Sequence, residues 1–126
     1  MALILIVDDA IFTRRVICKN LQKQGYETLE ASNGKQALEL LDSHTPDCIL
    51  LDLLMPEMDG WQVLQALQDK NIKIPVIVLT ADIQETSRQH CFELGALAVL
   101  NKPPKSEEMI EALQKALNLT TEENAP

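Results

Sequence analysis

Five polar residues follow short apolar segments of the sequence, and their side chains could bind a metal ion and a phosphate group. Asp8 and Asp9 come directly after the first apolar segment, and Asp52 comes directly after the third. Thr80 follows the fourth segment, and Lys102 lies just beyond the fifth. If the segments are parallel strands, their carboxyl ends share one edge of a sheet, and this edge is where such sheets bind ligands.

The charges of these residues indicate the chemistry that they support. Three carboxylates in one pocket repel each other, so the cluster needs cations. Mg²⁺ suits it, because this hard ion takes oxygen ligands and keeps several waters. The three aspartates, one Mg²⁺ and Lys102 sum to about zero charge, which suits a site that receives a phosphoryl group. The predicted reaction is phosphoryl transfer to a carboxylate, giving an acyl phosphate.

Four residues are the predicted nucleophile and metal ligands. Asp52 is the nucleophile and also a ligand of Mg²⁺. Asp9 is expected to ligate the metal directly, and Asp8 either directly or through water. The backbone carbonyl of Leu54 could supply a further ligand.

The remaining residues are predicted to contact the phosphoryl group. Lys102 would pair with one of its oxygens, the Thr80 hydroxyl would hydrogen-bond another, and the small Ala81 leaves room for it. Each polar residue also has a plainer explanation when it is taken alone. An aspartate after a strand is commonly a loop residue or helix cap, a threonine can start a helix, and a lysine is commonly a solvated charge. None of these explains five such residues at one end of one sheet.

The hydrophobic pattern predicts five strands that alternate with five helices. Near-continuous runs of Ile, Leu and Val suit strands buried on both faces of a parallel sheet, and the mixed second run suits an edge strand. The predicted strands are 3–7, 26–30, 48–51, 76–79 and 97–100. The predicted helices are 11–24, 34–41, 60–69, 84–94 and 106–117. This order predicts an α/β fold, an open parallel sheet with helices on both faces.

The composition is that of a single acidic domain. Hydrophobic residues make up 46% of its 126 residues, which allows a substantial core. The net charge of −8 disfavours nucleic acid and anionic membranes as partners. The N-terminus has no signal-peptide pattern, and the three cysteines have no metal or redox spacing, so we expect a cytoplasmic protein. We expect one domain over 1–119 and a frayed polar tail over 120–126.

Four motifs stand in colinear order within residues 3 to about 117. They are Val7-Asp8-Asp9, the ten residues from Leu51 to Gly60 (LDLLMPEMDG), Thr80-Ala81 and Asn101-Lys102-Pro103. With them the chain resembles the response regulator receiver domain, most closely the stand-alone CheY-like type. The resemblance implies a flavodoxin-like, doubly wound sheet of five strands in the order 2-1-3-4-5 with five helices.

The resemblance also implies a function in two-component signalling. Asp52 would take a phosphoryl group from a phosphohistidine of a sensor histidine kinase or a histidine phosphotransfer domain, in a reaction that depends on Mg²⁺. The domain would lose the group by slow self-dephosphorylation and would not otherwise be an enzyme. Output would pass by protein contact or phosphate relay to a downstream protein or phosphatase. The first helix, with Ile11, Phe12, Arg14 and Arg15, would help to dock the kinase.

Two positions depart from the family pattern. Val99 stands three residues before the lysine, where relatives usually carry the Tyr or Phe that swings inward on activation, and Pro104 stands where many carry an aromatic or long apolar residue. The family pattern also predicts a cis peptide bond between Lys102 and Pro103. Two further positions modulate attack of water on the phosphoryl group in the family, and they are Leu54 and Asp82 here.

Three other functions are alternatives for a chain of this pattern. A phosphatase of the haloacid dehalogenase type needs a second aspartate two residues after the nucleophile, where this chain has Leu54. A flavodoxin-like flavin carrier needs hydroxyl or glycine donors after the first strand, where Asp8 and Asp9 would repel the flavin phosphate. The third is an interaction module on a receiver fold that works without phosphorylation, which the loss of a site residue would favour.

Overall fold

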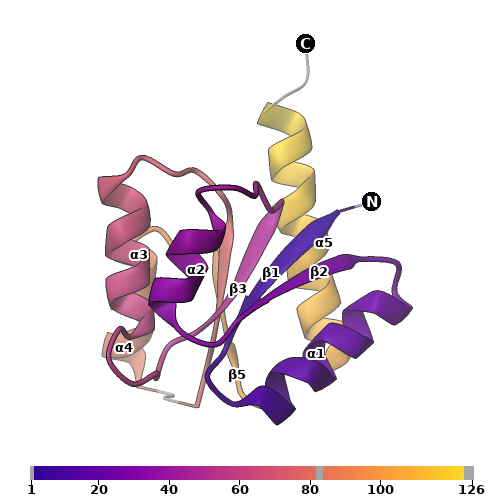
Figure 1. Cartoon of the computed structure of the whole chain (residues 1–126), viewed down its shortest axis with the longest axis horizontal. Helices are drawn as coiled ribbons and strands as arrows, with labels where there is room; N and C mark the ends of the chain where they lie inside the picture. Colours follow the sequence, from indigo (N-terminus) through magenta and orange to yellow (C-terminus); the bar gives the residue numbers. More distant parts are fainter. Residues whose placement is uncertain (1, 82–83, 124–126) are drawn as a thin grey trace.

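The computed structural model describes residues 2–81 and 84–123, and in it five strands alternate with five helices (Figure 1). In chain order they are β1 (Leu3–Val7), α1 (Ile11–Lys23), β2 (Glu27–Ala31), α2 (Gly34–Leu40), β3 (Cys48–Asp52), α3 (Gly60–Asp69), β4 (Val76–Thr80), α4 (Glu85–Glu93), β5 (Ala98–Asn101) and α5 (Ser106–Glu123). All strand pairs are parallel, and the sheet order is β2-β1-β3-β4-β5. The predicted fold class and strand order are therefore confirmed.

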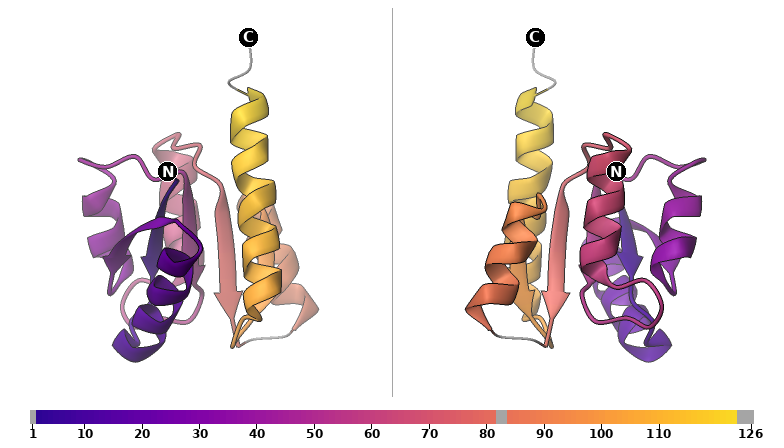
Figure 2. Two further views of the ribbon diagram at one scale, coloured as in Figure 1. Left: turned by 90° about the vertical axis from the view of Figure 1, so that its right-hand side faces the viewer. Right: turned by 90° about the vertical axis from the view of Figure 1, so that its left-hand side faces the viewer.

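The helices cover both faces of the sheet, with α1 and α5 on one face and α2, α3 and α4 on the other (Figure 2). Successive strand residues point to opposite faces of the sheet, so each buried strand contributes side chains to both hydrophobic cores. In β1, Ile4 and Ile6 pack on the α1–α5 side, and Leu5 and Val7 pack on the other. Every residue of β3 and β4 is buried, which explains their continuous apolar runs.

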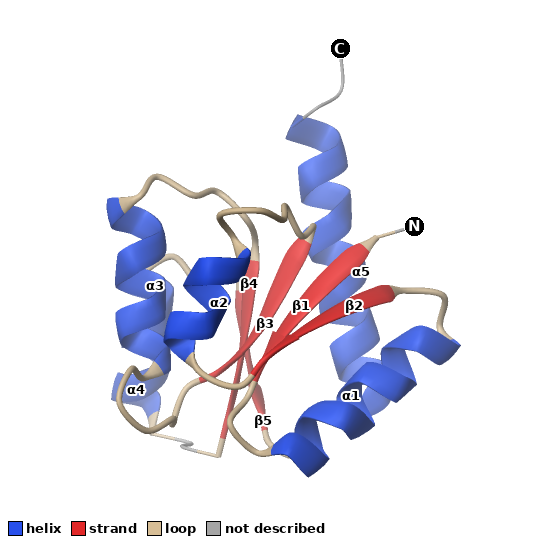
Figure 3. Cartoon of the chain, viewed as in Figure 1, coloured by secondary structure: helices blue, strands red, loops and turns tan. Residues whose placement is uncertain are grey.

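Local signals in the sequence account for four of the helix ends (Figure 3). Gly25 and Gly95 follow the ends of α1 and α4 with φ of 94° and 99°, a conformation that glycine adopts without steric cost. The Asn33 side chain accepts a hydrogen bond from the Gln36 amide and caps α2. Asp59 forms a capping box with Gln62 at the start of α3.

The C-terminal helix is longer than the predicted helix 106–117, because α5 continues to Glu123. Of the predicted polar tail over 120–126, residues 124–126 lie outside the described residues. No glycine or proline lies between Ser106 and Glu123, so nothing in the sequence stops the helix there. Other boundaries differ by one residue, as at β2 and β5. Within the described ranges, no helix combines the length and the hydropathy that a membrane span requires.

Candidate functional site

Three aspartates meet at the carboxyl ends of β1 and β3. These strands are neighbours, with Val7 opposite Leu51, so the residues that follow them emerge side by side. One carboxylate oxygen each from Asp8, Asp9 and Asp52 lies within 4.8 Å of the others. Asp8 and Asp52 are only 2% and 5% exposed, whereas Asp9 is exposed to solvent. The site is therefore a buried acidic pocket with one open side.

Lys102 reaches the pocket from the segment that follows β5. Its Nζ lies 2.8 Å from Asp8 Oδ2 and 3.2 Å from Asp52 Oδ1, so one ammonium pairs with two carboxylates. Its amide donates to the carbonyl of Thr80 at 2.9 Å, which ties this segment to the end of β4. The Lys102–Pro103 peptide bond is cis, as predicted.

The structure places the predicted phosphoryl-contacting residue Thr80 at the last position of β4, where it is 1% exposed. In the ladder Asp52 stands opposite Leu79, so Thr80 lies one residue beyond the aspartate on the adjacent strand. Ala81 follows it and is exposed. Leu54, two residues after Asp52, turns its side chain outward with 53% exposure. Asp82 lies outside the described residues.

Gly60 holds the segment after Asp52 against the sheet. Its amide donates to the Leu53 carbonyl at 2.8 Å. A Cβ at this position would lie 2.8 Å from the Asp52 carbonyl oxygen and 2.8 Å from Leu53 Cα. Because these contacts are with backbone, no side-chain rotation relieves them. The motif therefore requires glycine here so that α3 can start beside the nucleophile.

The electrostatics of the pocket follow from its burial. Burial raises the pKa of Asp52 from 3.8 to about 6; Lys102 opposes this shift, and the charges of Asp8 and Asp9 add to it. Burial also disfavours the charged form of Lys102, but its hydrogen bond to Asp8 and the charge of Asp52 outweigh this and raise its pKa. The pocket thus carries more negative charge than one lysine can balance.

Comparison with known proteins identifies the architecture. The family model "Response regulator receiver domain" matches residues 4–114. The receiver domain of the Francisella response regulator 1452 superposes with a TM-score of 0.91 at 29% identity, covering 95% of this chain and 99% of that chain. Vibrio cholerae CheY4 superposes with a TM-score of 0.86 at 33% identity, covering 93% and 99%. This chain belongs to the response regulator receiver domain family.

A curated relative of this receiver domain is considerably longer. The transcriptional regulatory protein SrrA of Staphylococcus aureus is 40% identical, and the match covers 98% of this chain and 52% of SrrA. The chain therefore spans about half the length of the curated relatives that it matches. What is shared is the receiver domain of two-component systems.

The donor set of this receiver domain fits a hard divalent cation. Three carboxylates and one ammonium leave two negative charges, which one Mg²⁺ balances. All side-chain donors in the cluster are oxygens, and the open side at Asp9 leaves room for the waters that Mg²⁺ keeps. The three cysteines take no part, because all are free and buried, and burial raises the pKa of Cys48 to about 12.

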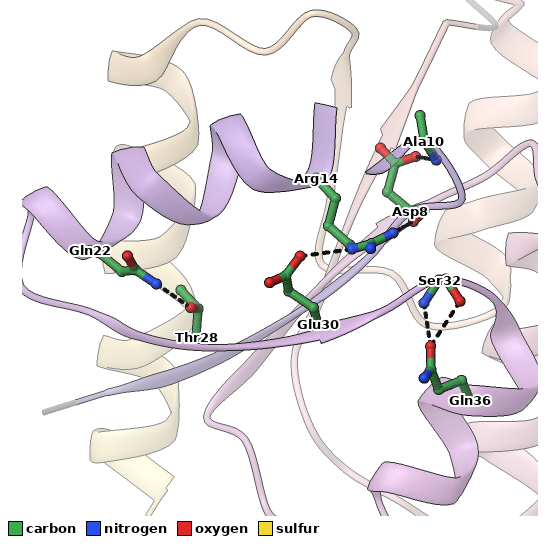
Figure 4. Close-up of polar contacts among 8 residues, drawn as sticks. All are labelled: Asp8, Ala10, Arg14, Gln22, Thr28, Glu30, Ser32 and Gln36. Carbon is green, nitrogen blue, oxygen red and sulfur yellow. Dashed lines mark hydrogen bonds and ion pairs between the residues drawn. The ribbon is translucent and has the colours of Figure 1, made fainter. Parts of the chain in front are cut away.

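Arg14 does not lie on the surface of α1, where the family resemblance predicts a residue that helps to dock the kinase. It is buried, with 8% exposure. Its Nε donates to Glu30 Oε1 at 2.9 Å, and its Nη1 donates to the Asp8 carbonyl at 2.6 Å (Figure 4). The spacing from Arg14 to the buried Ile17, Cys18 and Leu21 is helical, so the sequence did contain a signal that Arg14 faces inward. No comparable signal marked Glu30.

Proposed function

We propose that this receiver domain accepts a phosphoryl group on Asp52 from a phosphohistidine of a sensor histidine kinase or a histidine phosphotransfer domain. The observation that carries the proposal is the pairing of one lysine with two of three clustered carboxylates. Lys102 Nζ lies 2.8 Å from Asp8 Oδ2 and 3.2 Å from Asp52 Oδ1. In this arrangement the Lys102 ammonium lies beside the nucleophile, where it can stabilise the negative charge on the oxygens of an incoming phosphoryl group.

In the proposed reaction an ionised Asp52 oxygen attacks phosphorus. A bond forms between this oxygen and phosphorus, and the bond from phosphorus to the histidine nitrogen breaks. The electron pair of that bond stays on the imidazole nitrogen, which takes a proton from solvent as it leaves. The Lys102 ammonium pairs with one phosphoryl oxygen, and the Thr80 hydroxyl donates a hydrogen bond to another. With a pKa of about 6, most of Asp52 is already ionised at neutral pH.

Asp8, Asp9 and Asp52 are the residues proposed to hold Mg²⁺, with the Leu54 carbonyl as a further ligand. When bound, the ion would neutralise the carboxylates and the negative charge of the transferring group. Asp8 already accepts one hydrogen bond on each carboxylate oxygen, from the Ala10 amide and from Lys102. Asp9 is the exposed member and the most accessible to a hydrated ion.

The proposed docking surface for the phosphodonor is the exposed part of α1. Ile11, Phe12 and Val16 are 55%, 81% and 53% exposed and lie on one helix, and an exposed apolar patch is typical of an interaction site. Arg15 is exposed beside them, and Arg14 is excluded by its burial.

Output by protein contact or phosphate relay is proposed for the face formed by α4, β5 and α5. The similarity to SrrA makes control of transcription a candidate process downstream.

Incubation with a small phosphodonor and Mg²⁺ tests the proposal. Intact-mass spectrometry should show one added phosphoryl group, which a chelator suppresses and Asp52→Asn abolishes. Asp42→Asn is the matched control, because Asp42 is an exposed aspartate after α2. Full labelling of Asp52→Asn would refute the assignment. If the wild-type protein bound Mg²⁺ but took no phosphoryl group, an interaction module that works without phosphorylation would be the better description.

A further inference from the structure

We propose that Arg14, held by Glu30, is a positioning residue for the metal ligands of this domain. The inference rests on the proposed function, because it assumes that Asp8 and Asp9 hold a divalent cation. Within the described part of the chain, no hydrogen bond or ion pair joins the Arg14 side chain to Asp52 or Lys102. Its side chain donates to the backbone of Asp8 and to the side chain of Glu30.

The first step in the argument is what Arg14 holds. The β1 strand ends at Val7, and the amide of Asp8 continues the ladder by donating to the Ala31 carbonyl at 3.1 Å. Among the described residues, no backbone amide of the sheet donates to the Asp8 carbonyl. Arg14 Nη1 fills that place with a buried hydrogen bond of 2.6 Å (Figure 4). A buried carbonyl left unpaired would be costly, so the contact fixes the direction of this carbonyl.

The second step is what the carbonyl controls. The Asp8 carbonyl belongs to the planar peptide unit that leads into Asp9. Its direction therefore sets the direction in which the chain presents Asp9. The carboxylate of Asp8 is held separately, because Oδ1 accepts from the Ala10 amide at 2.9 Å and Oδ2 accepts from Lys102 at 2.8 Å. Arg14 thus holds the peptide unit between Asp8 and Asp9, which the two contacts of the Asp8 carboxylate do not fix.

The third step is why an arginine serves here. A buried guanidinium must be paired, and Glu30 on β2 neutralises it through Nε at 2.9 Å. The planar fork lets a different nitrogen reach the Asp8 carbonyl at the same time. The Arg14–Glu30 pair therefore supports the turn without changing the net charge of the pocket. A lysine would offer one ammonium nitrogen on a flexible stem in place of two nitrogens held in a rigid plane, so it would fix the direction of the carbonyl less firmly.

The decisive measurement is the affinity for Mg²⁺ of Arg14→Met, by isothermal titration calorimetry without a phosphodonor. The lost charge and the lost positioning of the ligands should change the Mg²⁺ affinity in opposite directions. Removing a positive charge near three carboxylates should by itself tighten Mg²⁺ binding, whereas loss of positioning should weaken it. We expect a weakening of roughly tenfold or more, as for other residues that orient metal ligands. Arg14→Lys should also bind more weakly than wild type.

The control is Lys19→Met, which removes one positive charge from an exposed residue of the same helix. It should leave Mg²⁺ affinity unchanged or slightly tighter. Urea unfolding in the presence of a chelator reports the stability of each variant separately. A purely structural Arg14 would lower that stability and leave the Mg²⁺ affinity of the folded protein unchanged or tighter, and either result would overturn the inference.

A second pair of variants covers the case in which Arg14→Met does not fold. Glu30→Gln keeps an oxygen acceptor for Arg14 Nε, and Glu30→Ala removes it, while both remove the same charge. The Glu30 side chain is 38% exposed, so both changes should be tolerated. Weaker Mg²⁺ binding in Glu30→Ala than in Glu30→Gln supports the positioning role, and equal affinities contradict it. Failure of the wild-type protein to bind Mg²⁺ would instead refute the proposed function.

Discussion

Asp52→Asn should stabilise the metal-free protein at neutral pH, although it removes the proposed phosphoacceptor. The Asp52 side chain is 7% exposed and shares its pocket with Asp8 and Asp9. Its ionised form is therefore unfavourable in the folded state, even with Lys102 at 3.2 Å. Asparagine has nearly the same shape and carries no charge. The substitution resembles permanent protonation of the carboxyl group.

The magnitude follows from the pKa of this group. Its pKa rises from 3.8 in the unfolded chain to about 6 in the folded protein. A shift of about two units corresponds to at most about 3 kcal/mol. A raised carboxyl pKa means that the folded state holds the proton over a range where the unfolded state has lost it. This contribution to stability is fully present below pH 3.8 and is lost as the pH rises through about 6.

Urea unfolding in the presence of a chelator, from about pH 5 to about pH 7.5, measures the effect. The free energy of unfolding of Asp52→Asn should exceed that of wild type by about 1.5 kcal/mol at the lower pH and about 3 kcal/mol at the higher. Asp42→Asn, at an exposed position, should show no such difference. Added Mg²⁺ should reduce this difference in the free energy of unfolding, because the ion binds the wild-type protein through one more carboxylate and so stabilises it more.

Two results would refute this reasoning. The first is an Asp52→Asn protein that is no more stable than wild type at the higher pH without metal. It would mean that Lys102 fully compensates the buried charge of Asp52. The second is a stability difference that does not change with pH. It would mean that asparagine acts through packing or hydrogen bonding and not through the charge.

Four further predictions concern the site and its output. Gly60→Ala should lower the free energy of unfolding by about 2 kcal/mol or more in urea titrations, because its Cβ would meet the Asp52 carbonyl oxygen at 2.8 Å; a neutral effect would contradict this. Lys102→Met should slow phosphorylation by a small donor by about a hundredfold in a time course while the protein still binds Mg²⁺. The phosphoryl group should persist for minutes or longer in a decay assay, because Leu54 cannot orient a water; loss within seconds would argue otherwise. Amide chemical shifts with a phosphoryl mimic should change less along β5 and α5 than in relatives with an aromatic residue at the position of Val99.

The strand-end residues could be predicted from the sequence because their positions depend on local patterns. Buried parallel strands are short apolar runs, and each run is followed by the residue that it presents at the edge of the sheet. The correct strands and the correct strand order are therefore enough to place Asp8, Asp52 and Thr80 at this edge. A shift of one residue in a strand boundary, as at β5, does not move Lys102 away from that edge.

The role of Arg14 could not be predicted in the same way, because it depends on contacts that are distant in the sequence. An arginine on a helix is usually exposed, and only a partner for its charge allows it to be buried. That partner, Glu30, lies 16 residues away on an edge strand whose pattern carried little signal. The other partner is a backbone carbonyl, which has no signature in the sequence. The helical spacing to Ile17 and Leu21 was the one clue available.

Val99 illustrates the same limit for signal output. The sequence shows only that an aromatic residue is absent, and the valine is buried at 6% exposure and stiff about its first torsion. The structure shows a contact that does not depend on that side chain, because Arg88 on α4 donates from Nη1 to the Val99 carbonyl at 3.2 Å. β5 is an edge strand, so some of its carbonyls face away from β4 and need such partners. One link between α4 and β5 therefore runs through the main chain of β5, in addition to the apolar packing of Val99 in the core that includes Cys91. A displacement of α4 would act on β5 through this hydrogen bond without any rotation of the side chain at position 99.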